Sequence, residues 1–223
     1  MLNRIPGIDY VFKDPGLLEK ALTHRSFGSH NNERLEFLGD AILSLVVADR
    51  LFHLHPDVSE GDLSRLRSRV VRGDTLARLA NKLRLSDHLI MGEGELKTGG
   101  FKKNSILADT LEALFGAIYL DGGFRECERV VRQACDDVID NLPDAEELKD
   151  PKTRLQEWMQ ARGRPLPIYQ LEKEEGAEHA KLFTVSVTLA GSREQAFASG
   201  SSRRKAEQAA ASQMLETLRT AAQ

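Results

Sequence analysis

The sequence predicts a multidomain chain, with an all-α domain followed by a small α+β domain of order αβββα. Three observations predict this fold class. From Leu17 to about Leu142, apolar residues recur at spacings of three and four, as they do on one face of a helix. The polar segment Asn141–Pro151, with two prolines, then interrupts that periodicity. Beyond it, three stretches alternate apolar and polar residues as strands do.

In the first domain, helices are expected between short polar breaks, and no convincing strand is found. The segment Leu38–Leu51 is apolar on nearly every face, which predicts a central helix surrounded by others. Cys127 and Cys135 lie eight residues apart on one expected helix, too far for a disulfide, so we interpret them as ordinary helix residues. The polar breaks lie at residues 27–32, 55–60 and 92–104.

The second domain is expected to begin with a helix, continue with three strands and end with a second helix. Glycines fall at the expected turns, and Ser201 and Ser202 are candidate caps for the last helix. We expect a first domain at 1–142, a linker at 143–149 and a second domain at 150–220. The expected second-domain elements are a helix at 151–162, strands at 168–174, 181–190 and 193–200, and a helix at 202–221.

Composition and charge limit the class of protein. The 223 residues carry a net charge of −3, divided into −6 over residues 1–150 and +3 over residues 151–223. The first part is therefore suited to cations and the second to phosphates. The sequence has no run of eighteen apolar residues and no continuous apolar segment at its start. We therefore expect a soluble, cytoplasmic protein that does not enter a membrane.

Two carboxylate clusters lie within the apolar helical patterns. Glu33, Glu36 and Asp40 share one narrow sector of a helix, and Asp109 and Glu112 share one edge of another. Like charges at such spacings repel by roughly 0.2–0.5 kcal/mol per pair, and a divalent cation would reverse that sign. A solvated acidic face remains the alternative interpretation, because spacing alone does not show that the two helices face each other.

Several segments resemble the ribonuclease III family of double-strand-specific endoribonucleases, along essentially the full length of its bacterial single-chain form. In the second domain, GAEHAKLF and GSSRRKAEQAAA resemble a double-stranded-RNA-binding domain. One difference is visible, since Asn31 stands where the family often has His. The first-domain segments are ALTHRSF (21–27), NNERLEFLGDAIL (31–43), SEGDLSRLRSRVV (59–71) and GEGELKTGGFKKNSILADTLEALFGAIYLD (92–121).

The resemblance implies a magnesium-dependent endoribonuclease that leaves 5′-phosphate and 3′-hydroxyl ends, with Mn²⁺ able to substitute for Mg²⁺. Its implied metal ligands are Glu36, Asp40, Asp109 and Glu112, with Asp40 and Glu112 most closely tied to catalysis. It implies processing of ribosomal, messenger and transfer RNA precursors. Glu33 and Glu60 match accessory acidic positions, although each also suits a helix start.

The resemblance also assigns a partner chain and an RNA-binding surface. Phe37, most simply a core aromatic, matches a position that joins two subunits in the family, which implies a homodimer. Such dimers place two catalytic centres on the two RNA strands. The residues implied to contact RNA are Thr153, Gln156, Glu157, Gln160, His179, Arg203, Arg204 and Lys205.

Two other functions stay open at this stage. A double-stranded-RNA-binding regulator would share the second domain but would not cut, and a helical scaffold would use its acidic edges to bind a basic partner. The complete carboxylate set favours the enzyme. The loop Gly92–Asn104 lacks the glycine and lysine order of a phosphate-binding loop, so we expect no nucleotide cofactor.

Overall fold

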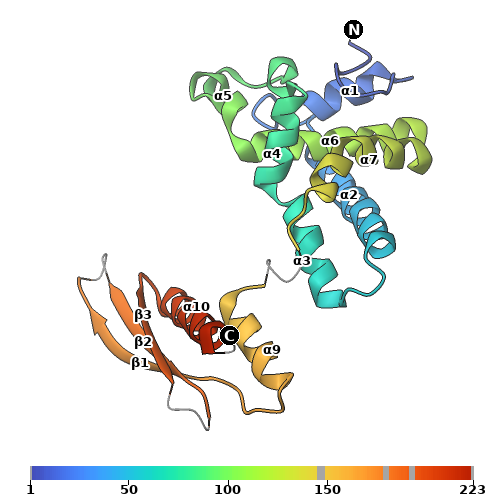
Figure 1. Ribbon diagram of the computed structural model, residues 1–223. Coiled ribbons are helices and arrows are strands. Elements are labelled where there is room, and N and C mark those ends of the chain that lie inside the picture. Colours follow the sequence, from blue (N-terminus) through green and yellow to red (C-terminus); the bar gives the residue numbers. More distant parts are fainter. Residues whose placement is uncertain (1, 145–148, 178–180, 191–193, 222–223) are drawn as a thin grey trace. The chain divides into compact units, whose positions relative to one another are not determined.

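The computed structural model describes residues 2–144, 149–177, 181–190 and 194–221 (Figure 1). The chain divides into two compact units, Met1–Ala145 and Glu146–Gln223. The first unit is helical and the second combines helices with a sheet. The helical segments of the first unit are α1 (Pro15–Leu22), α2 (Glu33–Leu54), α3 (Glu60–Val71), α4 (Gly73–Lys82), η1 (Leu85–His88), α5 (Glu93–Lys97), η2 (Gly100–Lys102), α6 (Asn104–Gly122) and α7 (Phe124–Asp140).

The core of the first unit surrounds α6. This helix contacts α1, α2, α4 and α7, and every residue from Ile106 to Ile118 is buried except Asp109 and Glu112. Both cysteines lie buried on α7 and form no disulfide, as expected for ordinary helix residues. Burying α6 removes a long apolar surface from water, which is the main source of stability in such a core.

The expectation of a central helix at Leu38–Leu51 is only half right. Leu43 and Val47 of α2 are buried, but the side chain of Leu45 is 56% exposed and that of Phe52, just beyond the segment, is 66% exposed. The most enclosed helix is α6 instead. A helix that is apolar all round but exposed on one side has a face available to another chain.

The second unit has the expected order of helix, three strands and helix. Its strands β1 (Ile168–Glu175), β2 (Leu182–Thr188) and β3 (Gln195–Gly200) form an antiparallel sheet in the order β1-β2-β3, with an irregularity between Leu171 and Lys173. Helices α9 (Pro151–Gln160) and α10 (Arg203–Ala221) cover one face of this sheet (Figure 1). Their shared core is built around residues such as Leu155, Val187 and Met214.

The predicted fold class is thus confirmed, with differences in detail. The break expected at Gly92–Asn104 contains the short segments α5 and η2, which periodicity cannot detect because each has five residues or fewer. Ser202 caps α10, since its Oγ accepts a hydrogen bond from the backbone N–H of Lys205 at 3.3 Å. None of the described helices is long and apolar enough to cross a membrane.

Candidate functional site

Two glycines allow α2 and α6 to cross with their backbones in contact. A Cβ atom built on Gly39 would lie 1.8 Å from the carbonyl oxygen of Glu112, and one built on Gly116 would lie 2.2 Å from that of Leu35. Neither helix can therefore carry a larger residue at the crossing without moving away from the other. The group that approaches Gly39 most closely is the backbone of α6.

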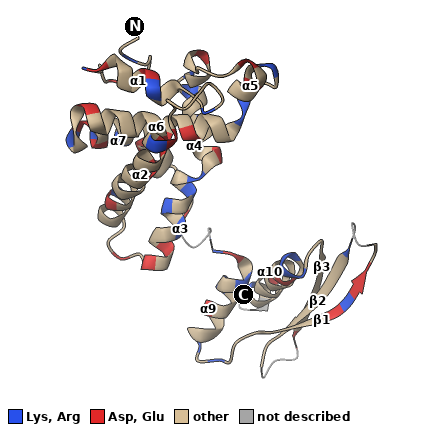
Figure 2. Cartoon of the chain, turned by 180° about the vertical axis from the view of Figure 1, so that it is seen from behind, with Lys and Arg blue, Asp and Glu red and all other residues tan. Residues whose placement is uncertain are grey.

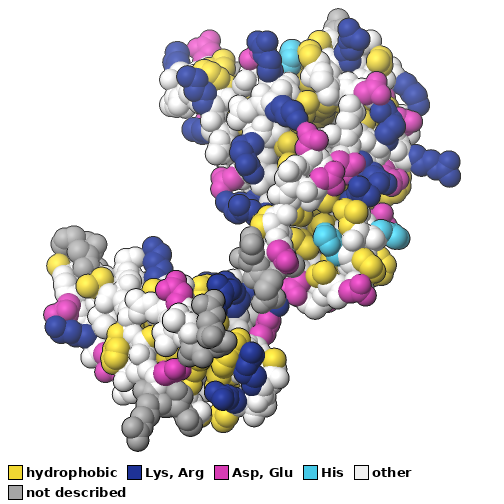
Figure 3. All heavy atoms as spheres, in the orientation of Figure 1, with side chains coloured by type: hydrophobic (Ala, Val, Ile, Leu, Met, Phe, Trp, Pro, Cys, Tyr) yellow, Lys and Arg dark blue, Asp and Glu magenta, His cyan; other side chains and the backbone are white. Residues whose placement is uncertain are grey.

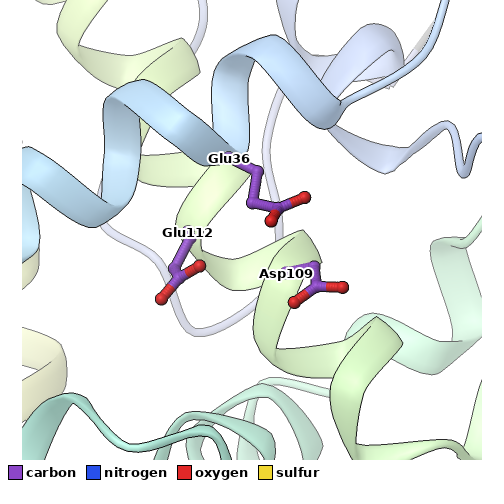
Figure 4. Close-up of side chains that lie close together, drawn as sticks. All are labelled: Glu36, Asp109 and Glu112. Atoms are coloured by element: carbon purple, nitrogen blue, oxygen red, sulfur yellow. The ribbon is translucent and has the colours of Figure 1, made fainter.

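This crossing brings carboxylates from the two helices together (Figure 4). Glu36 of α2 and Asp109 and Glu112 of α6 each offer a carboxylate oxygen, and these three oxygens all lie within 4.8 Å of one another. All three side chains are partly buried. Among the described residues, none of the three accepts a hydrogen bond or forms a close ion pair, although the charge of Arg25 acts on Glu36 and Asp109 from a greater distance.

Burial and mutual repulsion disturb the titration of these acids. Burial, followed by the charges of Asp40, Asp109 and Glu36, raises the pKa of Glu112 to about 8. Burial and the charges of neighbouring carboxylates also raise the pKa of Glu36, and burial raises that of Asp109. A carboxyl group with a raised pKa pays a penalty for ionising, and a bound cation would remove that penalty.

The other predicted acids lie at the edge of this cluster or away from it. Asp40 is exposed and is not among the three mutually close carboxylates, yet it is near enough to raise the pKa of Glu112. Glu33 lies at the start of α2, with a carboxylate oxygen 3.6 Å from Arg25. Glu60, at the start of α3, accepts a hydrogen bond from the Ser64 hydroxyl at 2.8 Å and belongs to a different surface depression.

An open cavity of about 550 Å³ lies beside the cluster and contains groups that sequence reasoning did not assign to the site. Glu95 and Lys103 form an ion pair of 2.7 Å on its wall. His24 also contributes to the wall, and its Nδ1 lies 2.9 Å from the Ser26 hydroxyl. The lining comprises His24, Arg25, Ser26, Asn32, Glu33, Glu36, Glu95, Lys103, Ser105, Ile106 and Asp109.

Long-range contacts explain why Glu95 escaped prediction. The backbone N–H of Gly92 donates to the Ser26 hydroxyl at 3.0 Å, and a short parallel bridge joins Thr23 to Ile90. These contacts bring the loop before α6 beside the loop before α2. A contact across 66 residues leaves no periodic signal in the sequence, although both loops lie in segments that carry the family resemblance.

In the second unit, the described residues predicted to contact RNA lie along α9 and at the N-terminal end of α10. Arg203, Arg204 and Lys205 are exposed at the start of α10, a basic region coloured blue in Figure 2. His179 lies outside the described residues. The predicted α9 residues Thr153, Gln156, Glu157 and Gln160 are at least partly exposed, at spacings that place them on one face of the helix.

Phe37 lies on the surface of the unit rather than in its core. Its side chain is 81% exposed, so the simple interpretation of a core aromatic is wrong for the single chain. Leu45 and Phe52 follow on the same side of α2, and Figure 3 shows hydrophobic side chains gathered over the end of this helix. Such a contiguous apolar face is typical of a surface that another protein covers.

Comparisons with known proteins match both units. The Ribonuclease-III-like family matches residues 14–137, and the double-stranded RNA binding motif matches residues 151–218. Ribonuclease 3 of Vibrio parahaemolyticus is 50% identical over 211 residues, which covers 95% of this chain and 94% of the relative. Ribonuclease 3 of Thiobacillus denitrificans is 53% identical over 207 residues, with 93% and 92% covered.

Solved structures agree with these matches. The nuclease domain of ribonuclease III from Campylobacter jejuni is 46% identical, with a TM-score of 0.59, over 61% of this chain and 94% of that one. Dicer from Pichia stipitis, at 24% identity and a TM-score of 0.50, covers 96% of this chain and 98% of its own, and shows a likeness of fold alone. With a helical unit that carries converging carboxylates and a following RNA-binding motif, the chain belongs to the ribonuclease III family.

Proposed function

We propose that this chain hydrolyses phosphodiester bonds of double-stranded RNA with magnesium, leaving 5′-phosphate and 3′-hydroxyl ends. Membership of an endoribonuclease family supports the class of reaction, and the RNA-binding motif supports the substrate. The observation that carries the proposal is the convergence of Glu36, Asp109 and Glu112, whose oxygens lie within 4.8 Å of one another. Three partly buried carboxylates placed this close together cost stability, and a regulator that only bound RNA would have no use for them.

The donor set fits a hard divalent cation. Magnesium prefers oxygen ligands and keeps several waters, so Glu36, Asp109 and Glu112 would hold it, with Asp40 beside them and Mn²⁺ as a substitute. When bound, the ion supplies activation of water and stabilisation of the leaving 3′ oxygen. We assign orientation of the substrate to Arg25 and Lys103, whose basic side chains lie on the wall of the cavity beside the cluster.

Binding of the duplex is assigned to the second unit. Arg203, Arg204 and Lys205 begin α10, where basic side chains and the free N–H groups of a helix start can together contact phosphate. The exposed face of α9 would contact 2′-hydroxyls in the minor groove, and His179 belongs to the same proposed surface. Domains of this kind recognise the shape of about 16 base pairs with little sequence preference.

A homodimer would complete the enzyme. The apolar side of α2, with Phe37, Leu45 and Phe52, borders the acidic edge of the same helix. A two-fold contact through this side would place two identical carboxylate clusters in one assembly, one for each RNA strand. The solved structure of a Campylobacter jejuni nuclease domain is described as flexible in a region involved in dimer formation, which supports the same assembly here.

The proposed setting is the cytoplasm, where precursors of ribosomal, messenger and transfer RNA are cut. The test of the proposed function is incubation of the purified chain with an end-labelled RNA hairpin and a single-stranded RNA, with magnesium or with EDTA. Cleavage of the hairpin alone, and only with magnesium, is expected. Stable binding of the hairpin without cleavage in either condition would favour the regulator instead.

A further inference from the structure

Polar side chains join α9 to α10 at the ends that carry the proposed RNA contacts. Gln208 of α10 touches the first turn of α9 at two points. Its Nε2 donates to Asp150 Oδ1 at 2.8 Å, and its Oε1 accepts from the backbone N–H of Lys152 at 3.0 Å. That N–H lies in the first turn and has no acceptor within its own helix. The Gln208 side chain therefore has two roles. It holds Asp150, the residue that caps α9, and it also accepts a hydrogen bond from the first turn of α9.

A second connection runs parallel to the first. Lys152 Nζ lies 2.6 Å from Glu207 Oε2, and the other oxygen of Glu207 accepts from Arg203 Nε at 3.1 Å. The Glu207 side chain is only 14% exposed, and Lys152 Nζ also lies 4.5 Å from the centre of the Tyr169 ring. A largely buried carboxylate with two cationic partners has a well-defined geometry.

Both connections end on residues assigned to RNA binding. Asp150 accepts from the backbone N–H of Thr153 at 3.0 Å and from its hydroxyl at 3.1 Å. Because the Thr153 hydroxyl donates its proton to Asp150, its oxygen lone pairs remain available to accept a hydrogen bond from a 2′-hydroxyl of RNA. Arg203, held through Nε by Glu207, keeps its terminal nitrogens for phosphate.

We infer that Gln208, Lys152 and Glu207 are positioning residues, which hold the RNA-contacting ends of α9 and α10 at the separation that an A-form duplex requires. This inference rests on the proposed RNA-binding function. Recognition by shape needs contact groups at a set spacing, because the spacing of grooves and phosphates carries the information. Contact groups that are ordered before binding also lose less entropy when they bind.

The test compares Gln208→Leu with Gln213→Leu, both in the full-length chain. Gln213 is exposed on the same helix and its side chain makes no hydrogen bond to the described residues. Since Gln208→Leu removes two hydrogen bonds, it should weaken duplex binding about tenfold, while Gln213→Leu should change it less than about twofold. Binding is measured well below the melting temperature of every variant, which thermal unfolding establishes.

A second comparison separates positioning from general loss of structure. In a chain that already carries Arg203→Ala, Arg204→Ala and Lys205→Ala, Gln208→Leu should have less than about a twofold further effect, because the proposed phosphate contacts of α10 are then absent. Glu207→Gln, which keeps the shape and removes the charge, should show the same dependence on background.

Equal losses in both backgrounds, or equal binding by Gln208→Leu and Gln213→Leu, would overturn the inference. Failure of the unaltered chain to bind the duplex would instead refute the RNA-binding role itself.

Discussion

Gly39 of α2 and Gly116 of α6 face each other across the helix crossing, so closely that a Cβ on Gly39 would lie 3.0 Å from the backbone nitrogen of Gly116. The same Cβ would lie 1.8 Å from the carbonyl oxygen of Glu112. The separation of the two helices at this point sets the separation of the carboxylates that they carry. Two residues without side chains therefore determine the geometry of the acidic cluster.

Gly39→Ala is expected to force the helices apart. Overpacking of this kind costs roughly 1–3 kcal/mol, and displacing a reacting group by about 1 Å lowers catalysis about a hundredfold. Thermal unfolding and RNA cleavage rates measure the two effects. Gly73→Ala is the control, because a Cβ there would meet no atom within 4 Å. Unchanged stability and activity of Gly39→Ala would contradict the close crossing.

Without divalent metal, stability should fall as the pH rises from about 4.5 to about 8. Burial and the neighbouring carboxylates raise the pKa of Glu112 from 4.5 to about 8, so the folded state keeps a proton that the unfolded state has already released. Glu112→Gln removes this cost, and at pH 8 in EDTA it should stabilise the chain by about 1–2 kcal/mol, or several degrees of melting temperature.

The stability that Glu112→Gln gains over the unaltered chain should decrease towards pH 5. Magnesium should stabilise the unaltered chain more than it stabilises Glu112→Gln. The exposed Glu19→Gln serves as the control. A melting temperature of Glu112→Gln below that of the unaltered chain at pH 8 in EDTA would show that Glu112 is not under repulsion.

Phe37→Asp should convert a dimer into a monomer. The side chain of Phe37 is 81% exposed in the single chain, and a carboxylate at that position would be buried without a partner if two copies met there. Equilibrium sedimentation measures the mass. Phe124→Asp, a change of the same kind at an exposed aromatic that begins α7, should leave the dimer intact. Persistence of the dimer in Phe37→Asp would place the interface elsewhere.

Replacing Arg203 and Arg204 by Ala should weaken RNA binding and flatten its dependence on salt. Each lost phosphate contact removes roughly one unit from the slope of log K against log salt concentration, so the slope should fall by about one to two units. Binding titrations at several salt concentrations measure it. Arg219→Ala, at the opposite end of α10, is the matched control, and an identical slope in the double variant would remove this region from the interface.

The sequence predicted what depends on local periodicity. The spacing of Glu36 and Asp40 on one helix, and of Asp109 and Glu112 on another, gave two acidic edges, because a helix repeats every 3.6 residues. It could not show that the edges meet, since nothing in the pattern relates Gly39 to Gly116 across 77 positions of chain. The family resemblance supplied that connection where periodicity could not.

The remaining differences have similar causes. The sequence pattern of an apolar position in α2 is the same whether its own chain or a second chain covers it. The segment Leu38–Leu51 was therefore predicted to be surrounded by helices, although Leu45 within it is exposed in the single chain. Glu95 lies beside the cluster because long-range contacts, among them the Gly92 N–H with the Ser26 hydroxyl and the Thr23–Ile90 bridge, join the two loops. Such contacts between distant loops depend on tertiary structure and have no counterpart in local spacing.

The most direct test of metal-dependent catalysis by the carboxylate cluster compares cleavage and binding of one RNA duplex by the unaltered chain, Glu112→Gln and Glu19→Gln. With magnesium, the unaltered chain and Glu19→Gln should cut, while Glu112→Gln should cut far more than 100-fold more slowly, beyond the roughly 10–100-fold effect of groups outside the metal ligands. All three should bind the duplex with similar affinity. Cleavage by Glu112→Gln at the rate of the unaltered chain would contradict the assignment of this cluster as the catalytic metal site.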